Sequence, residues 1–147
     1  MRIIELNSTN LKEFRGLMAL FSEAFEDPHN YSRNIASDSY VQALLQKEHM
    51  IFLTALKAEK VIGGLVAYVL DKFEQERSEV YIYDLAVASE FRRQGVATQL
   101  IVELQRLSKE RGAYTLFVQA DYEDAPAIKL YESLGVKEEV LHFDIKV

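Results

Sequence analysis

The chain has 147 residues, of which 49% are hydrophobic, and its formal net charge is −6. Length and composition suit a globular protein with one sizeable core rather than a disordered chain, so residues 1–147 are predicted to form a single domain. The acidic balance argues against nucleic-acid binding, and the absence of cysteine excludes disulfides, zinc–thiolate sites and a cysteine nucleophile.

The first elements predicted along the chain are a strand and a helix. Residues 2–6 form a short apolar run that is typical of a strand. A helix is predicted from residue 11 to about residue 25, because apolar side chains recur on one face: Leu11, Phe14, Leu17, Met18, Phe21 and Phe25. Pro28, within residues 26–30, breaks this helix.

A second helix is predicted after a loop at residues 31–36. Ser37 or Ser39 can cap its first turn, because a serine hydroxyl accepts a hydrogen bond from an amide that has no partner inside the helix. Its apolar side chains then follow at Tyr40, Ala43, Leu44 and Leu45.

Residues 50–56 and 60–70 predict two strands of a hairpin joined by a polar turn. Gly63 and Gly64 lie inside the second strand, where glycine indicates a bulge or the close approach of another part of the backbone. A charged connection at residues 72–78 follows the hairpin.

The stretch 79–107 combines a strand, a basic glycine turn and an amphipathic helix. β-Branched and aromatic residues dominate positions 80–87, as in a half-buried strand. The helix carries one apolar stripe: Val96, Leu100, Ile101, Leu104 and Leu107. Several amides at its start have no partner, and the helix dipole makes this point attractive to an anion, above all to phosphate.

The turn itself, at residues 92–97, supports this interpretation as an anion site. Gly95 permits a close backbone approach because it has no Cβ, while Arg92 and Arg93 can pair with phosphate oxygens. The alternative interpretation is a surface loop with two solvated arginines and a glycine that starts a helix.

The last part of the chain predicts a strand, a short helix and a final strand. Gly112 ends the preceding helix, residues 114–119 form a strand, and residues 121–124 form an acidic loop. A short helix is predicted at residues 127–134, and the alternation of residues 140–147 predicts the final strand.

This order of elements predicts an α/β (α+β) fold with a mixed, mostly antiparallel central sheet of six or seven strands and helices on both faces. Strands joined through a helix should lie parallel, whereas the early strands form an antiparallel meander. No membrane-spanning segment or secretory signal is evident, so we expect a cytoplasmic protein without a membrane partner. The three histidines show no metal-ligand spacing, so no metal is expected.

Two short motifs in the second half of the chain match those of a known family. Arg92, Gly95 and Ala97 match Gln/Arg-x-x-Gly-x-Gly/Ala between a strand and a helix. A second motif, Asn-x-x-Ala-x-x-Leu-Tyr-x-x-x-Gly-Phe, is matched by Asp124, Ala127, Leu130, Tyr131 and Gly135, with Asp124 in place of Asn and Val136 in place of Phe. The chain thus resembles the GNAT superfamily of acyl-coenzyme A-dependent N-acyltransferases, which implies the GNAT fold and acetyl-coenzyme A as cofactor.

Longer blocks resemble one branch of that superfamily. They comprise residues 73–75, 77–87, 114, 118–122 and 138–145. These blocks are similar to the aminoglycoside 3-N-acetyltransferases of the gentamicin type. The resemblance implies direct transfer of acetyl, within a ternary complex, to the 3-amino group of a 2-deoxystreptamine antibiotic, a cationic small molecule. It also implies a homodimer.

Direct transfer to an amine requires a base for the ammonium proton, a polarised thioester and an acid for the departing thiolate. The resemblance places Tyr131 beside the cofactor sulfur as the expected acid, with a tyrosine that only packs in the core as the alternative. Asp84 is the expected base, because it is a lone carboxylate in an otherwise apolar and aromatic strand. Glu79 is the alternative base, and Asp84 could instead bind a substrate ammonium group.

The cofactor is expected along one strand edge, at the helix start and at the last helix. The backbone of residues 85–87 should pair with the pantetheine amides like an added strand, and the amides of residues 92–98 should hold the pyrophosphate. The expected cofactor contacts are Leu85, Ala86, Val87, Arg92, Arg93, Gln94, Gly95, Val96, Ala97, Thr98, Asp124, Ala127 and Tyr131.

A polycationic sugar calls for carboxylates and flat rings at its binding site. The expected substrate contacts are Tyr31, Asp84, Asp121, Tyr122, Glu123 and Asp144. The same residues could instead form only a solvated or packed surface.

Two other functions remain open at this point. The chain could acetylate another amine, such as a polyamine or a protein amine, or it could be a noncatalytic sensor that binds acyl-coenzyme A, since fold alone does not fix activity. The presence of both Tyr131 and Asp84 favours catalysis, and the gentamicin-type blocks favour the antibiotic as substrate.

Overall fold

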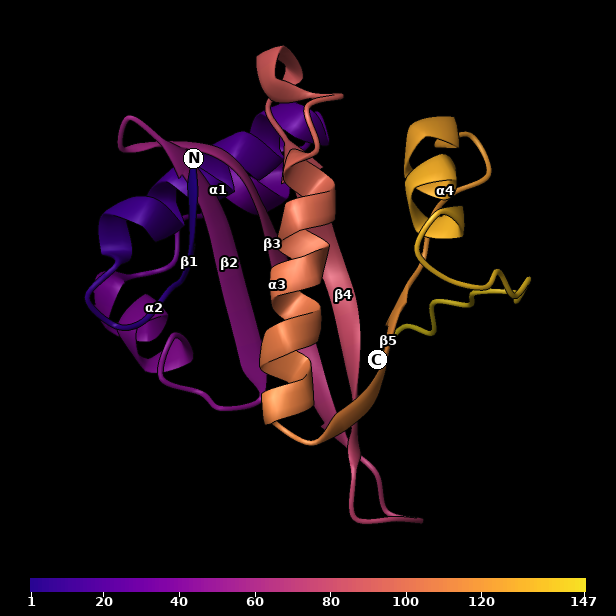
Figure 1. Cartoon of the computed structure of the whole chain (residues 1–147). Helices are drawn as coiled ribbons and strands as arrows, with labels where there is room; N and C mark the ends of the chain where they lie inside the picture. The colour runs from indigo at the N-terminus through magenta and orange to yellow at the C-terminus, as the bar shows by residue number, and fades with distance from the viewer.

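The computed structural model of the chain describes all 147 residues. Its centre is a five-stranded sheet in the order β1–β2–β3–β4–β5 (Figure 1). The strands are β1 (Arg2–Glu5), β2 (Met50–Lys57), β3 (Lys60–Asp71), β4 (Ser78–Val87) and β5 (Ala113–Val118). β1 to β4 pair antiparallel, whereas β4 and β5, joined through a helix, pair in parallel. The predicted mixed, mostly antiparallel sheet is therefore confirmed.

Helices cover both faces of the sheet, as predicted (Figure 1). The helices are α1 (Leu11–Ala24), α2 (Asp38–Leu44), α3 (Val96–Glu110) and α4 (Ala125–Glu132), with a π-helical turn η1 (His29–Arg33) and a 3-10 turn η2 (Ser89–Phe91). α3 packs on one face, while α1 and α2 pack on the other. None of the helices is both long and apolar enough to span a bilayer.

The core on the α3 face joins the predicted apolar stripe of this helix to the central strands. All five stripe residues, from Val96 to Leu107, are buried, and they pack with Ile51, Leu65 and Ile82 of the sheet. Full burial of a side chain of this size contributes roughly 1.5–3 kcal/mol. The stripe therefore holds α3, and with it the glycine turn at its start, firmly against the sheet.

The core on the opposite face is formed mainly by helical side chains: Phe14, Leu17, Phe21 and Val41. α1 can lie close to the sheet because Gly64 of β3 has no side chain. A Cβ at Gly64 would overlap Leu17 and would lie 2.6 Å from the carbonyl oxygen of Leu53. The register of β2 against β3 also shifts beside Gly63. Both features predicted from this glycine pair, a bulge and a close approach, are thus present.

Between α1 and β2, one prediction is confirmed and one is wrong. Ser37 caps α2, since its hydroxyl accepts a hydrogen bond of 3.3 Å from the amide of Tyr40. The loop predicted at residues 31–36 is wrong for residues 31–33, which belong to η1. Asp27 accounts for the difference, because its carboxylate accepts hydrogen bonds from both the amide and the side chain of Asn30 and so stabilises a further turn after Pro28.

Residues 140–147, predicted as a final strand, pair with no strand, so the sheet has five strands rather than six or seven. Apolar residues do alternate with polar ones from residue 141 on, but Leu141, Phe143 and Ile145 are 83%, 75% and 87% exposed. A strand needs a partner for its backbone hydrogen bonds, and an alternating sequence does not specify which edge provides it.

Candidate active site

β4 and β5 separate part-way along their length. The last pair between them is Ile82 with Val118, although β4 continues to Val87 paired with β3 alone. The backbone of β4 over residues 83–87 therefore has one free edge, and Figure 1 shows β5 leading away toward α4. A free strand edge can accept another extended chain, so it fits the added strand predicted at Leu85, Ala86 and Val87.

The turn between β4 and α3 leaves six consecutive amides, those of residues 93–98, without an acceptor in the chain. The next amide, of Gln99, donates to the carbonyl oxygen of Gly95 at 3.0 Å. The six amides surround the start of a helix of 15 residues, whose dipole adds positive potential at the same point. Such a group of donors is suited to phosphate oxygens, as the sequence predicts.

The conformation of this turn depends on two residues in the left-handed region. The φ angle of Gly95 is +80° and that of Arg93 is +62°. Arg93 is not glycine, so the backbone is locally strained. Arg92 offsets this strain by fixing the turn to the end of β4, because its Nε donates to the carbonyl oxygen of Val87 at 3.0 Å. The guanidinium of Arg93 forms no ion pair in the chain and is available to an anion.

The other residues of the turn would act through their amides rather than their side chains. Gln94 Nε2 donates to the carbonyl oxygen of Glu90 at 3.0 Å. Val96 is buried in the α3 core, and Ala97 packs against it. Thr98 is half-buried at the second position after Val96.

A β-bulge directs Asp84 to the α1 face of the sheet. Ile82 points toward α3, and strict alternation would direct Asp84 the same way. The register of β4 against β3 slips by one residue at Tyr83, so that Asp84 lies opposite Val66 in the α1 core. An extra residue of this kind re-aims the side chain that follows it, and here it exposes a carboxylate beside the free edge.

Asp84 is half-buried and has no cationic partner. Its Oδ2 accepts a hydrogen bond of 2.8 Å from the hydroxyl of Tyr31, and no ion pair of the chain includes it. Burial raises the pKa of Asp84, and the Tyr31 hydrogen bond opposes part of that rise. This carboxylate can therefore accept a proton, or receive the ammonium group of a ligand as the missing counter-charge.

Tyr131 of α4 packs against the core on the α3 face. Burial, with a smaller contribution from the negative charge of Asp124, raises the pKa of Tyr131 to about 12. The phenol therefore keeps its proton at neutral pH and can donate it. This geometry is compatible with the predicted role of Tyr131 as an acid, which stays a prediction.

Glu79, the alternative base, is engaged in other contacts. It accepts a short hydrogen bond from the hydroxyl of Tyr114, and its Oε1 lies 3.4 Å from Nζ of Lys72. These two contacts hold the pKa of Glu79 below its ordinary value. Five residues of strand, roughly 17 Å at about 3.4 Å per residue, separate Glu79 from Asp84. The arrangement favours Asp84 over Glu79 as the base.

Asp124 and Ala127 define the start of α4. Oδ1 of Asp124 accepts a hydrogen bond of 3.2 Å from the amide of Ala127, which makes Asp124 the N-cap of the helix. An aspartate side chain can make this cap as well as an asparagine side chain. Through this cap the two residues position the helix that carries Tyr131, and their contact with a cofactor stays a prediction.

Of the residues predicted to bind a cationic sugar, only Tyr31 contacts Asp84. Asp121, Tyr122 and Glu123 form the exposed loop before α4. Asp144 lies in the exposed C-terminal segment, where its Oδ1 is 3.0 Å from Nε2 of His142.

Sequence reasoning misses four aromatic side chains that lie on the same face as Asp84. They form a continuous row across β3, β4 and β5, here called the aromatic row: Tyr68, Tyr83, Tyr81 and Phe117. Successive ring centroids are 5.6, 5.8 and 4.8 Å apart. The sequence signal that could have revealed them is the spacing of the inward residues in β4. Leu85 follows Ile82 after three positions rather than two, which indicates the bulge.

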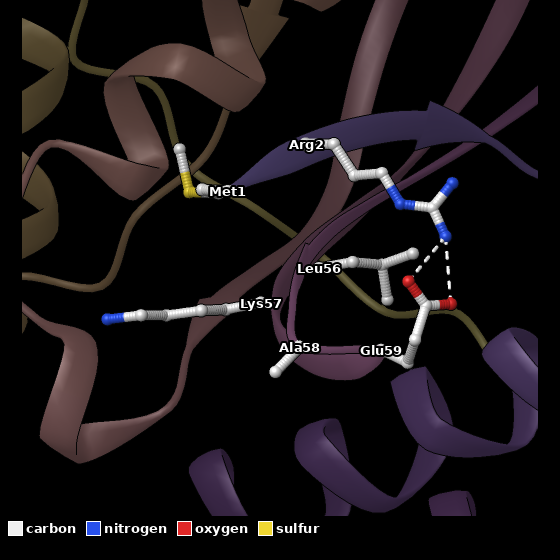
Figure 2. Close-up of a pocket in the computed structure, with 6 residues that line it drawn as sticks. All are labelled: Met1, Arg2, Leu56, Lys57, Ala58 and Glu59. Atoms are coloured by element: carbon white, nitrogen blue, oxygen red, sulfur yellow. Dashed lines mark hydrogen bonds and ion pairs between the residues drawn. The ribbon is translucent and has the colours of Figure 1, made fainter.

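A shallow hollow elsewhere on the surface has no such chemistry. It lies at the start of β1 and the β2–β3 turn and is lined by six residues (Figure 2): Met1, Arg2, Leu56, Lys57, Ala58 and Glu59. Arg2 NH2 donates two hydrogen bonds of 2.9 Å to the carboxylate of Glu59. Because its acid and its base satisfy one another, we assign no function to this hollow.

Comparison with known proteins identifies a matching family and similar solved structures. A family model described as the acetyltransferase (GNAT) family matches residues 14–136. The chain is similar to the crystal structure of an aminoglycoside acetyltransferase from an uncultured soil metagenomic sample, with 51% identity and a TM-score of 0.97 over 99% of this chain and 97% of that one. It is also similar to a second such enzyme in complex with sisomicin, with 34% identity and a TM-score of 0.91 over 99% and 95%.

Curated relatives are more distant. An aminoglycoside N(6′)-acetyltransferase of Salmonella enteritidis is 24% identical over 141 residues, which cover 94% of this chain and 92% of that protein. The human N-acetyltransferase 8 is 27% identical over 96 residues, which are 65% of this chain and 42% of the human protein. The chain thus spans less than half of the length of that human relative.

Proposed function

This chain belongs to the acetyltransferase (GNAT) family, and from that premise we propose that it is an acetyl-coenzyme A-dependent N-acetyltransferase whose acceptor is an aminoglycoside. One observation carries the proposal. The free edge of β4, the unpartnered amides of residues 93–98 and the unpaired carboxylate of Asp84 all fall within residues 83–98. The similar soil enzymes are named as aminoglycoside acetyltransferases, which supports the class of acceptor.

Acetyl-coenzyme A, the cofactor of the family, fits the residues that are present. When bound, it supplies an activated acetyl thioester. The amides of residues 93–98, with the guanidinium of Arg93, would hold its diphosphate, and the free edge at Leu85–Val87 would hold its pantetheine arm. No part of the chain crowds this turn, since a Cβ at Gly95 would meet only Nε2 of Gln99, at 3.9 Å, and the glycine itself leaves the amides accessible because it has no Cβ.

Asp84 is proposed as the base. An alkyl ammonium group with an ordinary pKa near ~10.4 is protonated at neutral pH, so it must lose a proton before it can act as a nucleophile. Burial raises the pKa of Asp84 toward the range in which a carboxylate works well as a general base. Tyr131 is proposed as the group that holds a proton on Oη for the leaving sulfur, because its phenol stays protonated at neutral pH.

The 3-amino group of a 2-deoxystreptamine ring is the proposed position of transfer. The blocks at residues 77–87 and 118–122 support it through their resemblance to the 3-N enzymes. The 6′-amino group is the alternative, because the curated Salmonella relative carries that position in its name. The exposed Asp121, Glu123 and Asp144, with Tyr122, are proposed as outer contacts that attract the charged sugar.

We extend the proposal to a homodimer. The outer edge of β5 pairs with no strand, and the apolar side chains of residues 136–147 are exposed. An unpaired strand edge and an exposed apolar segment are the kinds of surface that a second copy covers.

A thiol-release assay with acetyl-coenzyme A tests the activity directly. Kanamycin and gentamicin should release coenzyme A rapidly, whereas spermidine and a lysine peptide should release it slowly. NMR of the product identifies the acetylated nitrogen, and acetylation at the 6′-position would overturn the 3-amino assignment alone. Faster turnover of spermidine or the peptide would favour another amine as acceptor. Binding of coenzyme A without release from any amine would favour a sensor.

A further inference from the structure

The aromatic row is a feature that the acetyl-transfer chemistry itself does not require. Tyr68 lies in β3, Tyr81 and Tyr83 lie in β4, and Phe117 lies in β5. The rings of Tyr81 and Phe117 are stacked with an interplanar angle of 6°, whereas Tyr83 meets both of its neighbours edge to face. The row thus joins three strands into one aromatic surface.

This surface is open to solvent. α1 and α2 cover the sheet above β2 and β3, but Tyr83 remains 59% exposed and Phe117 remains 38% exposed. Cross-strand aromatic pairs stabilise a sheet, and that alone would account for two adjacent rings. Here a third tyrosine, Tyr83, follows Tyr81 on the same face, and the bulge turns Asp84 onto that face beside it. Stability of the sheet does not require the displacement of a carboxylate to the side of these rings.

The charge beside Tyr83 indicates what the aromatic row binds. Asp84 follows Tyr83 directly and carries a carboxylate that has no ion pair, and its Oδ2 accepts a hydrogen bond from the hydroxyl of Tyr31. Aromatic faces attract ammonium groups, and they also pack against the C–H faces of saturated rings. Ring faces beside an unpaired carboxylate are therefore complementary to a rigid ring that carries several ammonium groups.

We propose that the aromatic row is the platform on which a ring of the acceptor lies, and that it selects cyclic polyamines over linear ones. The proposal deepens the function proposed above and rests on it for the identity of the reacting amine. A flat platform gains contact area from a rigid ring, which is already ordered before binding. A flexible chain such as spermidine would lose conformational entropy to lie on the same surface.

Substitution at Tyr83 tests the platform. The exposed side chain can be removed with little loss of core packing, so Tyr83→Ala should fold. We expect it to weaken kanamycin binding, measured by calorimetry without acetyl-coenzyme A, by about fivefold or more, as is typical for one lost ring contact. Spermidine binding should not change, and Tyr83→Phe, which keeps the ring, should bind kanamycin like the wild type.

Phe73→Ala is the matched control, because Phe73 is a fully exposed aromatic residue, at 100%, in the β3–β4 connection. It should leave both affinities unchanged. Equal weakening of kanamycin and spermidine by Tyr83→Ala, or no weakening of either, would overturn the platform. Since calorimetry needs no turnover, a wild type that binds kanamycin but acetylates no amine would refute the proposed activity without touching this proposal.

Discussion

The hydrogen bond between Tyr31 and Asp84 sets the chemistry of the proposed base at the scale of single residues. Burial favours the neutral carboxyl of Asp84, whereas the donated hydrogen bond favours the charged carboxylate. Burial, together with the same hydrogen bond, raises the pKa of Tyr31, so its hydroxyl remains a donor at neutral pH. Tyr31 is thus better described as a residue that positions Asp84 than as a ring that stacks on a sugar.

Tyr31→Phe should move the acidic limb of the pH profile of kcat/KM to higher pH. Loss of the donor removes the interaction that lowers the pKa of Asp84, so burial alone remains and the carboxyl holds its proton more strongly. Tyr40→Phe serves as control, since Tyr40 is exposed and its hydroxyl makes no hydrogen bond in the chain. A limb that stays in place, or moves to lower pH, would contradict the role given to Tyr31.

Asp84→Asn should lower activity and raise stability at neutral pH. A buried carboxyl whose pKa is raised contributes stability that is full below its unfolded pKa and is lost as pH rises through its folded pKa. Asparagine avoids that loss and still accepts the Tyr31 hydrogen bond. Urea unfolding should therefore show an advantage for the variant at about pH 7 that shrinks toward about pH 4, while kcat falls about 100-fold or more. A variant that is less stable at neutral pH would count against an unpaired carboxylate.

At the scale of elements, the proposed phosphate site before α3 consists mainly of backbone amides rather than of side chains. Gly95 and Gly112 stand at opposite ends of α3 with nearly equal φ angles of +80° and +78°, and neither position is crowded. The two glycines therefore carry the same conformational demand, but only Gly95 lies among the unpartnered amides.

Gly95→Ala and Gly112→Ala should destabilise the protein to a similar extent, by roughly 1–2 kcal/mol each, because both place a Cβ in the left-handed region. Only Gly95→Ala should also weaken coenzyme A binding, measured by calorimetry, because its Cβ stands where the diphosphate is proposed to meet the amides. Equal affinities in the two variants would move the phosphate site away from residues 93–98.

Sequence reasoning predicts elements well where a periodic pattern and a cap coincide. The stripe from Val96 to Leu107, the cap at Ser37 and the glycine pair in β3 all behave as the pattern indicates. The sequence also contains a signal for the bulge at Tyr83, because the inward residues Ile82 and Leu85 are three positions apart. One extra residue is hard to recognise, however, in a run of apolar and aromatic residues. The prediction of a final strand is wrong because pairing is a property of two segments, and the alternation of residues 140–147 describes only one.

The same contrast between local patterns and long-range contacts applies to the candidate site. Backbone features, such as the free edge and the phosphate turn, follow from the order of elements and from the glycine. Side-chain partnerships do not, because contacts such as Tyr31 with Asp84, or Glu79 with Tyr114, join residues 53 and 35 positions apart. Asp84, the expected base, and Glu79, the alternative, therefore differ in the fold: Asp84 has no ion pair, whereas Glu79 contacts both Tyr114 and Lys72.

At the scale of the whole molecule, the exposed C-terminal segment is the part that one chain leaves uncovered. The substitutions Phe143→Glu and Ile145→Glu together should convert the proposed dimer into a monomer, because they place charges on an apolar surface that a partner would cover. Sedimentation of the wild type should show twice the mass of one chain. Val102→Glu on α3, which is 52% exposed, is the control and should remain a dimer. A wild type that sediments as one chain would remove the dimer from the proposal.

The extra residue in β4 acts as a shift of phase in an otherwise regular strand. Before it, odd-numbered residues face α1, and after it even-numbered residues do, all within the ten residues of β4. A chain that lacked Tyr83 would regain uninterrupted alternation, while Asp84 would still face α1 and Leu85 would still face α3, because the residues after the bulge would keep their register against β3. One deletion would therefore leave the polarity of both surfaces unchanged and would remove only the ring that joins Tyr68 to Tyr81.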